Sequence, residues 1–433
     1  MNNKVLALVV SSCLSLPMVS AVNMYIKQNG DEMVKFDVNR VKEVVFFEEG
    51  SLEIDESDTD LKFKVLSDST VEVISHPFSY NPYEVKHCII PDKVRIDGKA
   101  YFVTSIARGA FNGCANLSSI EIPSRVTDIE SFAFYGCTNI ESIELPSNLV
   151  NIGDSAFSGC SGLQYIEFPS SLLKIGNGAF SDCEDLHVVT IPSSVTSIGS
   201  APFCDCDNLE KINVESDNQY FSSLDGVLYD KNQEVIINVP VGIEGDFTIP
   251  SSVTAIGKEA FLGCHGLKRI EIPAGVTSIG FGAFGKCESL TSIDIPSNVT
   301  EIGSFAFWLC RELKNIEIPS GVTSIGYWTF TGCSSLESVK IPSSVTSIGY
   351  DAFSGCTSLT SVKIPSGVTS IAPYTFMDCS SLESLTIPSS VTLIERSAFC
   401  RCQKLELIID NSKDNVNVND ADFKDCKSVT YLK

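Results

Sequence analysis

The sequence has few basic residues and very few histidines. It holds 31 lysines and arginines against 54 aspartates and glutamates, which gives a formal net charge of -23. Such a chain repels phosphate groups, so nucleic acid and anionic membranes are not expected partners. The four histidines, His76, His87, His187 and His265, are scattered, and none lies in an H-E-x-x-H metal motif.

Motifs for catalysis and cofactor binding are missing as well. The chain has no G-x-S-x-G nucleophile segment and no phosphate-binding glycine loop. Asp410, Ser412 and Asp414 match the first calcium ligands of an EF-hand. However, Asn415 replaces the required glycine and Ala421 replaces the acidic twelfth ligand. We therefore predict a protein that is not an enzyme and that has no cofactor and no metal site.

Long apolar runs are absent beyond the N-terminus, so no transmembrane span is expected in the mature chain. Lys4 precedes a mostly apolar stretch at 5–16, and small residues at 19–21 allow cleavage after Ala21. This pattern is typical of a signal peptide. The alternative is a lipobox ending at Cys13, with a lipid anchor on that cysteine, but it leaves an apolar core of only six residues. Either interpretation predicts an exported protein, located at the cell surface or secreted.

The cysteines reveal a repeat of 23 residues. A phenylalanine stands three residues before each cysteine of this ladder, from Phe111 to Phe203 and from Phe261 to Phe399. The ladder consists of Cys114, Cys137, Cys160, Cys183 and Cys206, then Cys264, Cys287, Cys310, Cys333, Cys356, Cys379 and Cys402. A last pair, Phe423 and Cys426, arrives one residue late. Fixed spacing in so many copies predicts a repeat architecture.

One unit is almost undisturbed at residues 336–358, LESVKIPSSVTSIGYDAFSGCTS. Leu336, Val339 and Ile341 suit a short strand with one face inward. Pro342 ends that strand because it has no amide for the ladder. A second short extended piece is expected at 345–348.

The remainder of the unit is predicted to turn back. Gly349 is expected to adopt a turn conformation closed to other residues. Ala352, Phe353 and Cys356 fit one tight helical turn, with the phenylalanine and the cysteine pointing inward. A single unit has too few apolar side chains to offset its ordering entropy, so the units should stack around one continuous core.

The I-P-x-x-V-T-x-I-G-x-x-A-F-x-x-C pattern resembles the BspA-like leucine-rich-repeat family of bacterial surface proteins. It reads IPSSVTSIG at 191–199 and IPSGVTSIG at 318–326, and the resemblance covers about 88–433. The resemblance implies a right-handed leucine-rich-repeat solenoid with a parallel β-sheet face, short second strands, single helical turns and a β-rich N-terminal cap. It also implies a place at the cell surface or outside the cell. Adhesion to host matrix proteins or to other cells is a role of some members.

The expected organisation follows from these boundaries. It comprises a signal peptide at 1–21, a small strand-rich segment with an acidic linker at 22–60, an N-terminal β cap at 61–87, the solenoid at 88–409 and a C-terminal capping repeat at 410–433. The step from Cys206 to Cys264 is 58 residues, which predicts an extended repeat at about 212–248. Two strands around Asp230 to Gln233 should form a hairpin there, protruding from the side of the solenoid.

Seventeen cysteines in an exported chain raise the question of disulfides. Neighbouring ladder cysteines would have Cα atoms about 5 Å apart, within disulfide range, but stacked parallel side chains keep their Cβ atoms too far apart. We expect a buried column of reduced thiols that act as small apolar residues. Cys204 and Cys400 stand just before ladder members, and a strained bridge or weak metal ligation there stays open.

Outward positions of the first strand carry charges of one sign in runs. The column is acidic at Glu121, Glu144 and Glu167. Later it contains Glu271, Asp294 and Glu317, and then Lys340 and Lys363. One interpretation is an ordinary solvated surface. The other is an acidic strip beside a basic one, which would orient a charged protein partner.

Aromatic residues gather in the later repeats. The positions just after the repeat glycine are small or charged in most repeats. In successive later repeats they become Phe281, Phe305, Tyr327, Trp328, Tyr350 and Tyr374, and Trp308 lies nearby. The core is already filled by the Ala-Phe pair, so these rings should lie outside it, and exposed rings are costly unless they bind something. The alternative is that they pack against neighbouring loops as an ordinary flank.

Together these features predict a non-enzymatic adhesion or protein-interaction protein. The expected partner is a protein, such as a host extracellular-matrix or neighbouring-cell surface protein, bound through the aromatic residues and the charged strip. A glycan-binding or cell-envelope scaffold protein that uses the same aromatic flank is the alternative.

Overall fold

The computed structural model describes residues 23–28, 32–37, 45–48, 53–56, 61–75, 86–418 and 423–432. The expected signal peptide and Cys13 lie outside these residues, as does most of the acidic linker. Within the described part, no helix combines the length and the apolar character needed to cross a bilayer.

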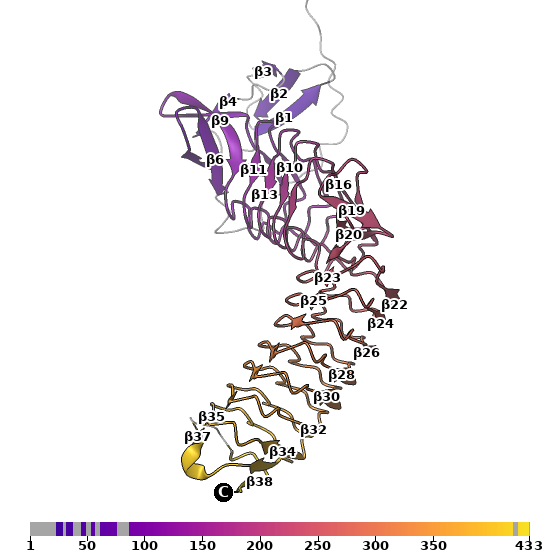
Figure 1. The fold of residues 1–433 in the computed structure, drawn as a ribbon. Coiled ribbons are helices and arrows are strands. Elements are labelled where there is room, and N and C mark those ends of the chain that lie inside the picture. The colour runs from indigo at the N-terminus through magenta and orange to yellow at the C-terminus, as the bar shows by residue number, and fades with distance from the viewer. Residues whose placement is uncertain are drawn as a thin grey trace, which may run out of the picture.

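The repeats coil into a parallel β-solenoid (Figure 1), as the 23-residue spacing predicted. The first strand of each level contributes to one long side of the rod. These strands are β10 (Ser119–Glu121), β12 (Ser142–Ile143), β14 (Tyr165–Ile166), β16 (Val188–Ile191), β18 (Lys211–Val214), β22 (Gly245–Thr248), β24 (Leu267–Glu271), β26 (Ser292–Ile293), β28 (Asn315–Glu317), β30 (Ser338–Lys340), β32 (Ser361–Val362), β34 (Ser384–Ile387), β36 (Glu406–Ile409) and β38 (Ser428–Tyr431). From β22 to β38 they form one nine-stranded sheet.

The second extended piece of each level forms a separate side. It comprises β11 (Asp128–Ile129), β13 (Asn151–Ile152), β15 (Lys174–Ile175), β17 (Ser197–Ile198), β23 (Ala255–Ile256), β25 (Ser278–Ile279), β27 (Glu301–Ile302), β29 (Ser324–Ile325), β31 (Ser347–Ile348), β33 (Ser370–Ile371), β35 (Leu393–Ile394) and β37 (Asn417–Val418). A single 3-10 turn, Lys413–Asn415, precedes β37. In Figure 1 the lower half of the rod has β24 to β32 along one edge and β23 and β25 along the other.

Strands also precede the first full repeat. They are β1 (Asn23–Gln28), β2 (Glu32–Asp37), β3 (Val45–Glu48), β4 (Glu53–Asp55), β5 (Lys62–Val65), β6 (Thr70–Ser75), β7 (His87–Ile89), β8 (Lys93–Ile96) and β9 (Lys99–Ile106). β5 pairs antiparallel with β6, and β6 pairs parallel with β9, which continues into β11. Val71 and Val73 of β6 are fully buried. These strands therefore extend the core beyond the first repeat.

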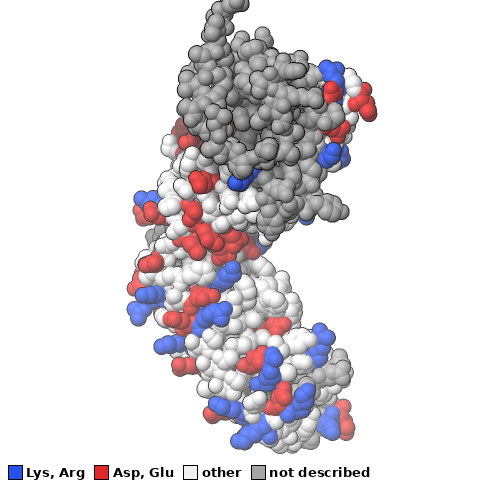
Figure 2. Space-filling view, turned by 180° about the vertical axis from the view of Figure 1, so that it is seen from behind, with Lys and Arg blue, Asp and Glu red and all other residues white. Residues whose placement is uncertain are grey.

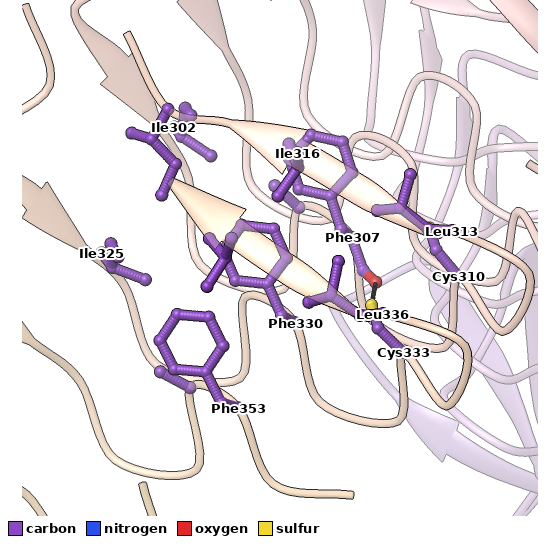
Figure 3. Close-up of a cluster of buried hydrophobic side chains, with 14 of the residues drawn as sticks. Ile302, Phe307, Cys310, Leu313, Ile316, Ile325, Phe330, Cys333, Leu336 and Phe353 are labelled. Atoms are coloured by element: carbon purple, nitrogen blue, oxygen red, sulfur yellow. Dashed lines mark hydrogen bonds between the residues drawn. The ribbon is translucent and has the colours of Figure 1, made fainter. Parts of the chain in front are cut away.

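The core of each level is built from the same inward side chains (Figure 3). The ladder phenylalanines stack with ring centroids 5.0–5.7 Å apart and interplanar angles of 1–25°. Phe330, for example, is fully buried between Phe307 and Phe353. The phenylalanine column is thus a continuous apolar spine within each run of regular repeats.

The cysteine column is buried as expected, but its thiols are more than small apolar groups. In ten levels the Sγ–H donates to the carbonyl of the ladder phenylalanine in the preceding level, at 3.0–3.3 Å. Figure 3 shows this bond between Cys333 and Phe307. A cysteine at this position therefore fills a small space and also satisfies a buried carbonyl between levels.

The expected helical turn is a chain of separate hydrogen-bonded turns. Within one level the Cys333 N–H donates to the Phe330 carbonyl at 3.1 Å, whereas the Phe330 N–H donates to the Ala352 carbonyl of the next level at 2.8 Å. Left-handed backbone at Trp328 (φ 58°) and Gly332 (φ 74°) brackets the turn. This alternation lets the turn segments form a third hydrogen-bonded ladder along the rod.

The role expected for the repeat glycine is wrong. Gly349 does not have a positive φ; the left-handed residue comes two positions later, at Asp351 (φ 53°). A Cβ on Gly349 would lie 2.6 Å from the Tyr327 backbone nitrogen of the preceding level. Glycine is needed here because two backbones approach closely.

The extended repeat does form a hairpin, but the hairpin does not project freely. β19 (Phe221–Leu224), β20 (Val227–Asp230) and β21 (Val235–Asn238) are antiparallel, and β21 continues in parallel into β23. Val227, Leu228 and Tyr229 are buried. The hairpin therefore belongs to the core, and its turns at 224–225 and 231–234 reach the surface.

Candidate interaction surfaces

Backbone geometry positions the aromatic residues of the later repeats. Phe305, Trp328 and Tyr374 occupy the left-handed site that follows the second strand, with φ of 60°, 58° and 57°. Other levels place Gly178 and Gly282 at the same site. Bulky side chains are rare in this conformation and cost about 1–2 kcal/mol each. The chain thus accepts strain to place rings at this corner of the coil.

Six rings make one cluster, which we call the aromatic ridge: Phe281, Phe305, Trp308, Tyr327, Trp328 and Tyr350. Phe305 is its centre, with centroids 5.0 Å from Phe281, 6.1 Å from Trp308, 5.4 Å from Tyr327 and 4.8 Å from Trp328. Tyr327 and Tyr350 stack at 5.4 Å with an interplanar angle of 2°. Sequence spacing alone predicted these residues as a group, and the structure brings them together.

Exposure within the ridge is uneven. Tyr327 is 39% exposed and Tyr350 is 42% exposed, whereas Phe281, Phe305 and Trp328 are half-buried. The ridge therefore has a packed base and two tyrosines that reach solvent. The rings pack against one another, as the packing interpretation predicted. Two of them are also exposed, as the binding interpretation requires.

Cations lie at both ends of the aromatic row. The Lys258 Nζ lies 5.3 Å from the centroid of Phe281. Tyr374 makes no ring contact with the ridge in the described structure, and the Arg396 guanidinium lies 5.2 Å from its centroid. The sequence analysis missed both cations, although Lys258 and Arg396 stand directly after the repeat glycine position, like the rings themselves.

The charged strip lies on the first-strand side. Glu271 and Asp294 line a shallow hollow of about 430 Å³ together with Arg269. A second hollow of about 480 Å³ is lined by Asp294, Glu317 and Lys340. The two hollows share Asp294, so they form one continuous depression across β22 to β30.

The sign of the strip changes where a carboxylate and an ammonium pair. Glu317 faces Lys340 across the parallel strands, and the two side chains form an ion pair. Lys363 continues the basic part of the strip but does not line either hollow. Both members of the pair are exposed, so it contributes little to stability.

The ridge and the strip lie on different sides of the coil. The ridge follows β25 to β31, and the strip lies on β24 to β32, which Figure 1 shows along opposite edges. We expected one partner to use both surfaces. The structure separates them, so a partner must wrap around the rod or choose one.

The thiols have no features of reactive or metal-binding groups. None of the cysteines that the structure describes, Cys204 and Cys400 included, forms a disulfide. Burial raises the pKa of the Cys160 and Cys333 thiols to about 12. Protonated thiols are poor nucleophiles and poor metal ligands. Among the described residues, no group of three or more His, Cys, Asp or Glu side chains is placed to hold a metal.

Comparison with known proteins gives a family and a fold. The profile of the BspA type leucine rich repeat region matches in six copies, over residues 104–224, 245–327 and 300–430. A leucine-rich repeat protein from Eubacterium ventriosum has a similar structure, with a TM-score of 0.62 and 28% identity over 79% of this chain and 93% of that one. The pneumococcal vaccine antigen PcpA is similar at a TM-score of 0.52 and 21% identity, over 96% of this chain and 100% of that one. No protein of curated function matches the sequence.

Proposed function

This chain belongs to the BspA-type leucine-rich-repeat family, and we propose that it is an exported, non-enzymatic adhesion protein that binds another protein through its aromatic ridge. The observation that carries the proposal is the exposed, stacked pair Tyr327 and Tyr350 on a packed aromatic base. Tyrosine and tryptophan dominate the binding energy of many protein interfaces. The expected partner is a host extracellular-matrix or neighbouring-cell surface protein.

Backbone strain supports a binding role for the ridge. Phe305 and Trp328 stand in a left-handed conformation that every regular level adopts at this site, in other levels with glycine or with residues such as Ser155. Strained residues persist where the surrounding structure holds them, and they cluster at functional sites. The fold requires this conformation at the corner but does not require a large aromatic side chain there, which is less favourable in it than glycine or aspartate.

Ring orientation favours a protein over a glycan. Sugar rings stack on open aromatic faces. One face of Tyr327 is covered by Tyr350, and Phe305 meets Tyr327 at an interplanar angle of 87°. Stacking thus leaves fewer open faces for a sugar ring, and the tyrosine hydroxyl suits hydrogen bonding to a peptide partner. The glycan-binding or envelope-scaffold role is the second candidate.

A matched pair of variants tests the proposal. Tyr327→Ala with Tyr350→Ala removes the exposed part of the ridge, and Tyr165→Ala with Tyr220→Ala removes two tyrosines that are 58% and 53% exposed elsewhere. Each variant is screened against an array of extracellular-matrix proteins and an array of glycans. We expect the ridge variant to lose its matrix-protein binding at least about tenfold, corresponding to about 1.4 kcal/mol or more, and the control to keep it.

Other outcomes would decide against this assignment. Full binding by the ridge variant would exclude the ridge as the binding surface. Hits on the glycan array alone, lost in the ridge variant, would establish the second candidate. Export is tested separately by mass spectrometry of the mature N-terminus, which distinguishes cleavage after Ala21 from a lipid on Cys13.

A further inference from the structure

The solenoid core is divided at the extended repeat. Buried side chains form two clusters, one that includes Leu61 to Leu228 and one that includes Val227 to Val416. The phenylalanine stack ends at Phe203 and resumes at Phe261. The single continuous core that the repeat spacing predicted is therefore wrong for this chain, because the extra residues of the extended repeat interrupt it.

Both strand ladders are interrupted at the same place. On the first-strand side β18 pairs with β16, and a new sheet begins at β22. On the second-strand side one sheet ends at β17 and the next begins at β19. The thiol bond is weak here as well, since the Cys264 Sγ lies 3.9–4.0 Å from its two nearest carbonyls.

Strands β20 and β21 are the elements that the two clusters share, since Ile236 of β21 packs in the second cluster and Ile237 against the first. Their side chains alternate, as they do along any strand. Leu228 packs in the first cluster, while Val227 and Tyr229 pack in the second. Two four-residue strands are a narrow connection for two rods of stacked repeats.

An ion pair bridges this joint on the turn side. The Lys286 Nζ lies 2.7 Å from the Asp205 Oδ2, although the two residues are 81 positions apart. Both side chains are largely enclosed, at 32% and 19% exposure. Nearby, the His265 Nε2 lies 3.6 Å from the Asp205 Oδ1, and the Cys204 Sγ lies 3.8 Å from the Leu262 carbonyl.

Lys286 has more than one carboxylate to neutralise. Burial raises the pKa of Asp182, the charge of Asp205 raises it further, and Lys286 opposes this shift. Glu184 and Asp207 add negative charge to the same group. Figure 2 shows acidic side chains gathered at this height of the rod. Removal of the lysine would leave like charges close together in a partly enclosed site.

We propose that the protein is two cooperative units joined at β20 and β21, and that the Lys286–Asp205 ion pair is the latch that holds the joint closed. Each unit has its own core, so the joint can open without loss of either core. The second unit contains the aromatic ridge and the hollows, and the first contains the N-terminal strands. The joint would then set the angle between the two.

Native cysteines report on the opening. Cys204 lies at the joint and is 5% exposed, whereas Cys160 and Cys333 lie inside the first and second units and are fully buried. Lys286→Met removes the cation and keeps the length of the side chain. Lys340→Met is the matched control, because its ion pair with Glu317 joins neighbouring levels within one unit. Maleimide labelling of each thiol in the native state is followed by peptide mass spectrometry.

We expect Lys286→Met to accelerate labelling of Cys204 at least tenfold and to leave Cys160 and Cys333 unchanged. The control should change none of the three. Loss of the positive charge alone would have the opposite effect on labelling. Lys286 lowers the pKa of the Cys204 thiol, so its removal would leave less thiolate and slow labelling if the joint stayed closed. Unchanged labelling of Cys204, or equal acceleration of all three thiols, would overturn the proposal. If Lys286→Met does not fold, the exchange Asp205→Lys with Lys286→Asp supplies the test: fast Cys204 labelling in that folded variant would likewise overturn it.

Discussion

The buried thiol column predicts an unusual loss of stability in mild alkali. Desolvation raises the pKa of four thiols from 9.0 to about 12, namely Cys88, Cys160, Cys333 and Cys402. Each thiol is an acid whose neutral form is favoured in the folded state. Between pH 9 and 12 the folded chain therefore holds more protons than the unfolded chain, and stability falls as pH rises. The contribution is fully present below the ordinary pKa and is lost above it.

The size of the effect follows from the shift. Between pH 8 and pH 10 each such thiol costs on the order of 1 kcal/mol of stability. Four thiols together amount to roughly 5 kcal/mol, which is comparable with the entire unfolding free energy of many domains. Other ladder thiols, such as Cys287 and Cys356, have raised pKa values for the same reason and add to the loss.

Urea unfolding followed by circular dichroism, with reductant present, measures this dependence at intervals from pH 7 to pH 10.5. The double variant Cys160→Ala with Cys333→Ala is the control. It should start less stable but lose roughly 2–3 kcal/mol less between pH 8 and pH 10, because two of the linked protons are gone. An unfolding midpoint that stays constant from pH 8 to pH 10, or an equal slope in the variant, would refute the reasoning.

Three further predictions concern the repeat itself, each checked by denaturant unfolding. Phe330→Ala should cost about 3–5 kcal/mol, because it opens a cavity in a fully buried stack. A loss below 1 kcal/mol would contradict that packing. Gly303→Ala should cost about 1–3 kcal/mol, since the added Cβ would lie 2.4 Å from the Phe281 backbone nitrogen. Ser155→Gly should instead stabilise the chain by up to about 1 kcal/mol, because φ at that position is 52°.

Sequence reasoning was strongest where one residue type recurs for one physical reason. The phenylalanine and cysteine columns repeat at a fixed step, and an inward position must repeat in every level of a stack. The strands ending at Pro342 and spanning 345–348 followed from the same logic. The structure has them at β30 and β31 (Ser347–Ile348), within two residues.

The same reasoning was weaker for the backbone between the columns. A glycine in a repeat indicates either a positive φ or a close approach of two backbones, and one sequence does not distinguish them. Gly349 meets the second requirement and Asp351 meets the first. Aspartate is among the residues that tolerate the left-handed region. A search for glycines alone therefore misses the positive φ at this position.

Ion pairs between residues far apart in the chain could not be predicted from the sequence, for a different reason. The 58-residue step between Cys206 and Cys264 predicts an irregular level, but it does not say which turns become neighbours across it. The structure brings Asp205 against Gly263, and this contact lets Lys286 of the following level reach the carboxylate. Nothing in the spacing of charges indicated that pair.

The repeat assigns folding and binding to different positions, and this division explains how the ridge is possible. The inward columns are nearly identical in every level. Each level therefore buries the same apolar side chains, whichever residue stands at its left-handed corner position. Strain at Phe305, Trp328 and Tyr374 costs on the order of 3–6 kcal/mol in total. In a small domain that sum would approach the whole stability. In a stack it is spread over levels that each share two neighbours, so bulky rings can occupy a site that suits glycine. Ser155, Glu259 and Asp351 hold the same left-handed conformation in other levels, with φ of 52°, 57° and 53°, so the corner belongs to the fold and only the side chain placed there differs between levels.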